Sequence, residues 1–135
     1  MMISIVIPVL NENESLSELY LEISDVISAY DESEFLVLPS RWELSPLTPL
    51  EGFAFKKPVI STNVHGIPYT ISNGKNGILV EPDDPLSLSN AILELYDNEE
   101  KCRKFGISGY NLVQTECNSL RMTEETLEIY KKVIK

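Results

Sequence analysis

The chain has 135 residues, 43% of them hydrophobic and 24% charged, so we expect one folded domain rather than a disordered or fibrous chain. Its formal net charge of −10 repels nucleic acids and anionic lipid surfaces, which excludes nonspecific binding to either. The longest apolar run, residues 5–10, is far shorter than the roughly 20 residues that span a bilayer, and no base precedes it. We therefore predict no transmembrane segment, no secretory signal and a cytoplasmic location.

Strand and helix patterns alternate along the first third of the chain. Residues 3–10 are almost all apolar and rich in β-branched side chains, the pattern of a strand buried on both faces of a parallel sheet. From Leu16 to Tyr30 apolar residues recur every three or four positions, which predicts an amphipathic helix. A second buried strand is expected at residues 35–38, where Pro39 ends the apolar run.

The same alternation continues through the middle of the chain. A helix is predicted around residues 50–55, followed by a strand at residues 58–61 and another at residues 77–81. Alternating strands and helices favour crossover connections and a parallel sheet. The expected fold class is therefore α/β, with a parallel sheet of about four strands and flanking helices.

Three helices are predicted after the last strand. Asp84 before Pro85 is a good start for the first, and Asn98 can cap the second. Gly106 and Gly109 each weaken the second helix by roughly 1 kcal/mol relative to Ala, so we expect it to bend or break there. The third begins at Ser119, and its periodicity predicts that four apolar side chains point inward: Leu120, Leu127, Tyr130 and Ile134.

The two cysteines are too few for a disulfide scaffold. Neither Cys102 nor Cys117 has a neighbouring His or Cys at metal-ligand spacing. We therefore expect both to be free thiols with a structural role.

The loop of residues 39–51 holds the strongest candidates for chemistry. In open parallel sheets, ligands bind outside the carboxyl ends of the strands, where helix N-termini attract anions. The carboxylates of Glu43 and Glu51 could accept hydrogen bonds from sugar hydroxyls there. Simpler roles are open for each: Glu51 could complete a capping box with Thr48, Glu43 could be a solvated loop charge, and Trp42 a partly buried anchor.

Several segments resemble the C-terminal part of family 4 glycosyltransferases, over roughly residues 30–135. They occur in the order of the family: FLVLPS at 35–40, the pair Glu43 and Glu51 with seven residues between them, KPVIST at 57–62, GIP at 66–68, and NGKNGILV at 73–80 followed by Pro82. The resemblance implies part of the two-domain GT-B (Rossmann-like) fold, a nucleotide-sugar donor and transfer that retains the anomeric configuration, with no metal and no cofactor.

The same resemblance implies roles for individual residues. Glu43 would face the donor sugar as the catalytic residue, and Glu51 would hold the ribose hydroxyls. Further donor contacts are predicted at Ser45, Leu47, Thr48, His65 and Gly66. For His65, the sole histidine, the simpler alternative is a loop residue that faces solvent or the donor cleft, because no partner for general-base catalysis is visible in the sequence.

The chain also departs from the family pattern. Where the family loop usually contains Gly, this chain has Pro46 and Pro49, each of which removes one N–H donor. Tyr69 stands where the family often has Glu. The basic pair that usually meets the donor phosphates lies upstream of this region in the family, and only three bases precede residue 75 here: Arg41, Lys56 and Lys57.

The first residues, ISIVIPVLNE at 3–12, resemble instead the start of family 2 glycosyltransferases, although that family's Asp-x-Asp motif is absent from the chain. The alternative is that they simply supply a sheet strand. We therefore predict one partial nucleotide-sugar-binding domain over residues 1–135, with a separate strand and helix at 1–30 and the glycosyltransferase region at 31–135.

Two functions fit that domain. One is glycosyl transfer from a nucleotide sugar, for which a partner subunit or oligomer would supply the acceptor domain. The other is a noncatalytic module that binds a nucleotide sugar or a partner, as a truncated glycosyltransferase. In either case we expect the isolated chain to bind donor weakly and to transfer nothing, because catalysis needs the acceptor held against the donor.

Overall fold

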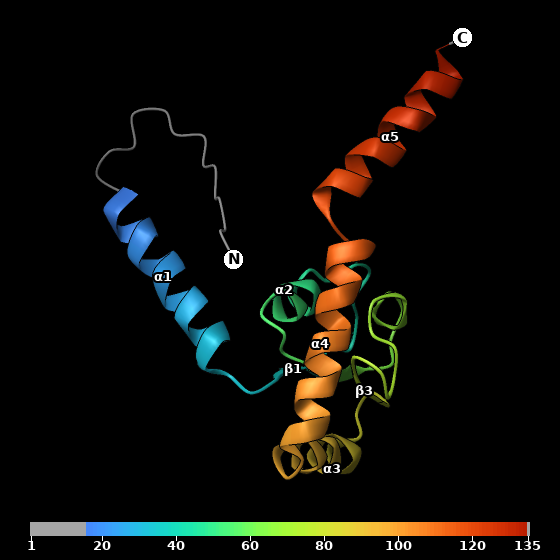
Figure 1. The fold of residues 1–135 in the computed structure, drawn as a ribbon. Helices are drawn as coiled ribbons and strands as arrows, with labels where there is room; N and C mark the ends of the chain where they lie inside the picture. The colour runs from blue at the N-terminus through green and yellow to red at the C-terminus, as the bar shows by residue number, and fades with distance from the viewer. Residues whose placement is uncertain (1–15, 135) are drawn as a thin grey trace. The chain divides into compact units, whose positions relative to one another are not determined.

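The computed structural model describes residues 16–134, drawn as a ribbon in Figure 1. The chain divides into two compact units, residues 1–32 and residues 33–135. The described part of the first unit is helix α1 (Leu16–Glu32), blue in Figure 1, which confirms the helix expected there. The strand predicted at residues 3–10 lies outside the described residues.

The second unit is built on a parallel sheet. Its strands β1 (Leu36–Leu38), β2 (Val59–Thr62) and β3 (Gly77–Val80) confirm the three predicted within it, and they lie in the order β1-β2-β3. Leu36 is opposite Val59, which is in turn opposite Gly77. The described residues thus form three parallel strands where about four were expected.

Helices connect and cover these strands. Their bounds are α2 (Thr48–Ala54), the 3-10 turn η1 (Ile67–Tyr69), α3 (Pro85–Tyr96), α4 (Glu99–Thr115) and α5 (Ser119–Val133). Both predicted caps are confirmed, since Asp84 accepts a hydrogen bond from the Ser87 backbone N–H at 3.0 Å and Asn98 accepts one from that of Lys101 at 2.9 Å. The α/β class expected from the sequence is therefore observed.

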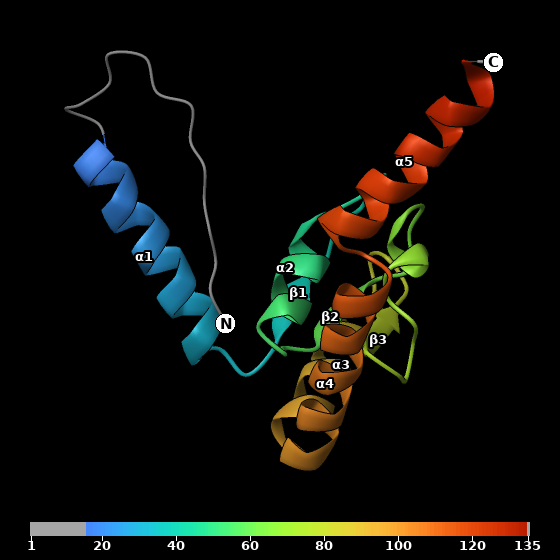
Figure 2. The ribbon, with the colours of Figure 1, turned by 45° about the horizontal axis from the view of Figure 1, so that its top comes forward.

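The core consists of two apolar clusters, because successive side chains of β2 point to opposite faces of the sheet. Val59 belongs to one cluster with Phe53 of α2. Ile60 belongs to the other with Leu95 of α3 and Phe105 of α4. Helices α2 and α4 pack against each other, as both views show (Figures 1 and 2). The sheet is thus covered on both faces, which leaves its strand ends as the place for a ligand.

Helix α4 runs unbroken through Gly106 and Gly109, so the predicted break is wrong. Both glycines are buried where another part of the chain comes very close. A Cβ on Gly106 would lie 1.8 Å from the carbonyl oxygen of Lys56, and one on Gly109 would lie 2.2 Å from the Phe53 ring. The low helix propensity of glycine is offset here by close packing against α2 and the turn after it.

The inward face predicted for the last helix is also wrong. Leu120, Leu127, Tyr130 and Ile134 are between 50% and 79% exposed. Within the described residues, α5 buries none of its side chains. Periodicity identified an apolar stripe but could not show that anything covers it.

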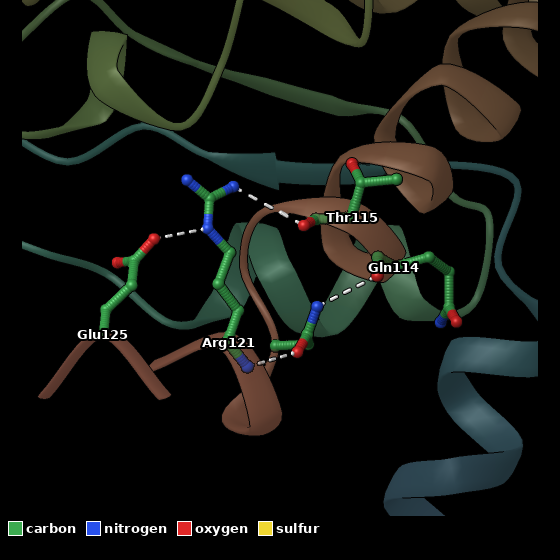
Figure 3. A network of polar contacts seen from close by, with 5 residues as sticks. Gln114, Thr115, Arg121 and Glu125 are labelled. Atoms are coloured by element: carbon green, nitrogen blue, oxygen red, sulfur yellow. Dashed lines mark hydrogen bonds and ion pairs between the residues drawn. The ribbon is translucent and has the colours of Figure 1, made fainter. Parts of the chain in front are cut away.

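A polar network holds the junction between α4 and α5 (Figure 3). The Asn118 side chain accepts a hydrogen bond from the Arg121 backbone N–H at 3.0 Å and donates one to the Gln114 carbonyl at 2.9 Å. The Arg121 guanidinium pairs with Glu125 at 2.7 Å, and the hydrogen bond and charge of Glu125 raise the pKa of Arg121. Helix α5 thus begins at a specific polar cap although its apolar face is uncovered.

Both cysteines are free thiols, as expected. Cys102 is buried on α4, where its Sγ donates to the Glu34 carbonyl at 3.2 Å, and burial raises the pKa of its thiol. Cys117 is exposed. In the part of the chain that the structure describes, no helix is long and apolar enough to cross a membrane.

Candidate functional site

The loops that follow β1 and β2 meet at the carboxyl ends of the strands. The backbone N–H of Gly66 donates to the carbonyl oxygen of Glu43 at 3.0 Å. A Cβ at Gly66 would lie only 1.6 Å from the carbonyl oxygen of Leu44, so only glycine fits this approach. Two predicted site residues, Glu43 and Gly66, are therefore brought together through their backbones.

Two buried hydroxyls of β2 hold the start of the same loop. Ser61 Oγ donates to the carbonyl oxygen of Leu38 at 2.7 Å, and Thr62 Oγ1 donates to that of Ser40. Both hydroxyl residues are almost fully buried, so these hydrogen bonds satisfy groups that would otherwise be costly to bury. The loop after β1 is thus attached to the sheet at its base and to the Gly66 loop further along.

The carboxylate of Glu43 is half-buried and partly oriented. Ser40 Oγ donates to Glu43 Oε1 at 3.3 Å. An ionised carboxylate has about four acceptor positions, so this one hydrogen bond leaves room for ligand hydroxyls. Glu43 is therefore more than a freely solvated loop charge, although its position alone assigns it no ligand.

The residue before Glu43 in the chain belongs to an aromatic pair. The rings of Trp42 and His65 have centroids 4.0 Å apart and planes tilted by 51°. Trp42 is 64% exposed, so the expectation of a partly buried anchor is wrong. His65 has a backbone φ of 40°, in the left-handed region that residues other than Gly adopt uncommonly, although His, like Asn and Asp, is enriched there. The sequence did not predict this pair, because the two residues come from different loops.

The remaining predicted residues lie at the start of α2. Ser45 and Leu47 are exposed in the loop, Thr48 is the first residue of the helix, and Glu51 is exposed in its first turn. Leu47 is the N-cap and makes no side-chain cap hydrogen bond, so the alternative in which Thr48 caps the helix in a box with Glu51 is wrong. A role for Glu51 outside helix capping is therefore left open.

Two of the three bases that precede residue 75 have partners of their own. Arg41 Nε pairs with Asp83 Oδ1 at 2.9 Å, with both side chains largely exposed. Lys56 Nζ lies 5.0 Å from the centroid of the Tyr110 ring. The charge of Arg41, in the loop after β1, is thus partly neutralised by Asp83 of the loop after β3.

A cavity of about 420 Å³ lies at the carboxyl end of the sheet, but none of the predicted site residues lines it. Its charged lining residues are three acids and one base: Glu81, Asp83, Asp84 and Arg41. The negative charge exceeds the positive charge, so the cavity does not suit a pyrophosphate. Hydrogen bonds from the hydroxyl and the backbone N–H of Ser87 hold the pKa of Asp84 below its ordinary value. The cavity is lined by Pro39, Arg41, Thr62, Val80, Glu81, Asp83, Asp84, Pro85 and Leu88.

Among residues 16–134, no group of three or more His, Cys, Asp or Glu is placed to hold a metal ion.

Comparison with known proteins gives a consistent family match. The family model described as glycosyl transferases group 1 matches residues 12–112. An uncharacterized glycosyltransferase of Methanocaldococcus jannaschii is 41% identical over 85 residues, covering 63% of this chain and 24% of that protein. This chain spans about a quarter to a third of the length of such relatives.

Solved structures agree with the fold. A glycosyltransferase of Rickettsia africae matches with a TM-score of 0.72 and 28% identity, over 90% of this chain and 35% of that one. HepE of Anabaena, in complex with UDP-glucose, matches with a TM-score of 0.75 and 16% identity, over 91% of this chain and 38% of that one. At that identity the second likeness shows the fold alone.

Proposed function

The chain belongs to the glycosyl transferases group 1 family, and we propose that its second unit binds a nucleotide-sugar donor for a transfer that retains the anomeric configuration. Its α/β fold is part of the GT-B, Rossmann-like fold of such enzymes. In this proposal Glu43 faces the transferred sugar and Glu51 accepts hydrogen bonds from the ribose hydroxyls. No metal and no cofactor is needed.

The observation that carries the proposal is the attachment of the Glu43 loop to Gly66. The 3.0 Å hydrogen bond and the lack of space for a Cβ hold the Glu43 backbone at the carboxyl end of the sheet. A carboxylate held before ligand arrives loses little conformational freedom on binding, which favours recognition of hydroxyl groups. This edge is also where open α/β sheets bind their ligands.

The other proposed donor contacts come from the same two loops. One group, in the segment that leads from Glu43 into α2, consists of Ser45, Leu47 and Thr48. The other group, in the loop after β2, consists of His65 and Gly66. A structural neighbour of the same fold holds UDP-glucose, which supports a nucleotide sugar as the ligand class. The donor phosphates meet few cations here, because Arg41 is paired with Asp83 and the chain carries a charge of −10.

Binding assays on the full chain test these two roles separately. We expect Glu51→Gln to weaken binding of UDP-glucose and of UDP about equally, because both contain ribose. Glu43→Gln should weaken binding of UDP-glucose alone, because UDP has no hexose. Each loss should be roughly tenfold, the usual consequence of losing a hydrogen bond to a charged group.

Isothermal titration with UDP-, GDP- and ADP-linked hexoses and their diphosphates measures these affinities. Glu100→Gln is the matched control, since Glu100 is an exposed carboxylate on α4. Unchanged affinity in Glu43→Gln and Glu51→Gln, or no binding of any nucleotide sugar to the wild type, would contradict the proposed donor site.

A second candidate is a noncatalytic module that binds a nucleotide sugar or a partner. Residues 33–135 form one compact unit, whereas transfer also needs an acceptor held against the donor, which is why a binding role is considered beside catalysis. We propose a partner subunit or oligomer as one source of that acceptor. Radiolabelled donor incubated with the purified chain and mixed acceptors distinguishes the two: transfer above the rate without protein means an enzyme, and none means a module.

A further inference from the structure

Trp42 is an exposed aromatic ring at the edge of the proposed donor site. It is 64% exposed although indole is a large apolar group that proteins usually bury in good part. The next residue along the chain is Glu43, whose carboxylate has acceptor positions beyond its bond to Ser40. One short loop thus carries an exposed apolar ring and a carboxylate on consecutive residues.

The ring is held in place rather than free to turn. Its centroid lies 4.0 Å from that of His65, a distance typical of aromatic contact. The backbone of the two loops is joined at the neighbouring residues, where the Gly66 N–H donates to the Glu43 carbonyl at 3.0 Å. His65 keeps its backbone at φ 40°, a strained conformation that the surrounding loop has to maintain. This exposed ring is thus positioned before any ligand binds.

Such a surface has the two groups that recognise a sugar ring. The face of an aromatic ring is negative, so it attracts the slightly positive C–H groups on one face of a pyranose. Carboxylates accept hydrogen bonds from the hydroxyl groups around the rim of the sugar.

We propose that Trp42, held by His65, is a stacking platform for the pyranose ring of a carbohydrate. The proposal rests on the proposed donor site, because Glu43 is taken there to face a sugar. The pyranose is either the hexose of the nucleotide sugar or a ring of the acceptor. In this inference His65 acts on the sugar as a positioning residue, through the Trp42 ring, beside the donor contact proposed for it above.

Trp42 is the only tryptophan of the chain, so its fluorescence reports on this position alone. We propose titrating the full chain with UDP-glucose, UDP-galactose and GDP-mannose, with UDP and GDP, and with the methyl α-glycosides of the three hexoses. Saturable change with a nucleotide sugar but not with its diphosphate identifies the donor hexose as the stacked ring. Saturable change with a methyl glycoside identifies a free or acceptor saccharide.

Variants then test the ring itself by ligand-observed NMR, which needs no tryptophan. Trp42→Leu should weaken binding of the responding sugar by roughly three- to tenfold, the range of an aromatic contact, and Trp42→Phe should weaken it less. His65→Gly relieves the strained φ, so the fold should be retained. It should nevertheless weaken sugar binding and lower the fluorescence anisotropy of Trp42. Leu93→Ala, at an exposed apolar residue of α3, is the control and should change nothing.

The outcomes separate this inference from the proposed function. If nucleotide sugars bind and depend on Glu43 and Glu51 while Trp42 emission stays unchanged with every probe, the platform is wrong and the donor site stands. If no nucleotide sugar binds but a methyl glycoside changes the emission and Trp42→Leu weakens that binding, the platform stands without the donor site. Sugar binding that is equal in wild type and Trp42→Leu overturns the platform.

Discussion

Helices α4 and α5 follow one another in the chain, with 17 and 15 residues, yet they are used very differently. Helix α4 buries Cys102 and Phe105 together with two glycines that allow close approach to α2. Helix α5 has an apolar stripe of similar periodicity, but every described side chain on it is exposed. The comparison shows that periodicity predicts a helix and the side it would bury, whereas burial depends on what the rest of the fold places against it.

The largest difference should come from removing one apolar side chain of each helix. Phe105→Ala should lower the free energy of unfolding by about 3–5 kcal/mol, because Phe105 is 4% exposed in a packed cluster. Leu127→Ala should change it by less than about 0.5 kcal/mol, because Leu127 is 50% exposed. Urea unfolding of the full-length variants measures both. A large loss in Leu127→Ala would mean that α5 is packed in solution.

A smaller effect is expected from adding one methyl group inside α4. Ala is normally preferred to Gly in a helix by about 1 kcal/mol, so Gly106→Ala would stabilise an uncovered helix. Here the added Cβ meets the Lys56 carbonyl, and we expect a loss of about 1–3 kcal/mol instead. Gly109→Ala should cost less, because its neighbour is the Phe53 side chain rather than backbone. Asn111→Ala, at an exposed position of α4, is the matched control, and a stabilised Gly106→Ala would refute the close contact.

The N-caps of the two helices allow a finer comparison. Asn98 and Asn118 each accept a hydrogen bond from the backbone N–H three residues later, at 2.9 and 3.0 Å. Replacing either by Ala should cost about 1 kcal/mol of helix stability. For Asn98→Ala we expect that loss in global unfolding, because α4 is part of the core. For Asn118→Ala we expect it only as faster hydrogen exchange in α5, and equal global losses would contradict this.

The smallest expected effect is a pH dependence of stability from the N-cap of α3. That cap is Asp84, which titrates, whereas the N-caps of α4 and α5 are asparagines, which do not. Hydrogen bonds from Ser87 lower the pKa of Asp84 below 3.8, so the cap contributes stability above that pH and loses it as the pH falls through the lowered pKa. Acid titration of wild type followed by circular dichroism should show this loss, and Asp84→Asn should remove that part of the pH dependence. An identical acid profile in Asp84→Asn would show that other carboxylates dominate.

Local signals were enough to predict part of the fold. The three strands in the second unit follow from short apolar runs that end in Pro, Asn or Glu, and the caps at Asp84 and Asn98 follow from their own side chains. The prediction for Gly106 and Gly109 failed because it used only helix propensity, which is a local property. The contacts of these glycines with Lys56 and Phe53 are tertiary. The exposure of α5 is missed for the same reason.

The candidate site divides in the same way. The rule that ligands bind at the carboxyl ends of parallel strands predicts the loop of Glu43 and Glu51 from the sequence. It cannot predict that Gly66 binds the Glu43 backbone or that His65 contacts Trp42, because these pairs join two loops that lie over 20 residues apart in the chain. The exposure of Trp42 likewise depends on where the two loops meet.

The buried hydroxyls of β2 also help to fix the register in which the strands pair. Side chains of the strand alternate between the two clusters, with Val59 on one face and Ile60 on the other, and Ser61 and Thr62 follow in the same alternation. A slip of one residue would exchange the faces and separate both hydroxyls from their carbonyl partners on Leu38 and Ser40. Each buried hydroxyl left without a partner costs about 1–3 kcal/mol. Although the strands have only three and four residues, this cost disfavours pairing in a shifted register during folding.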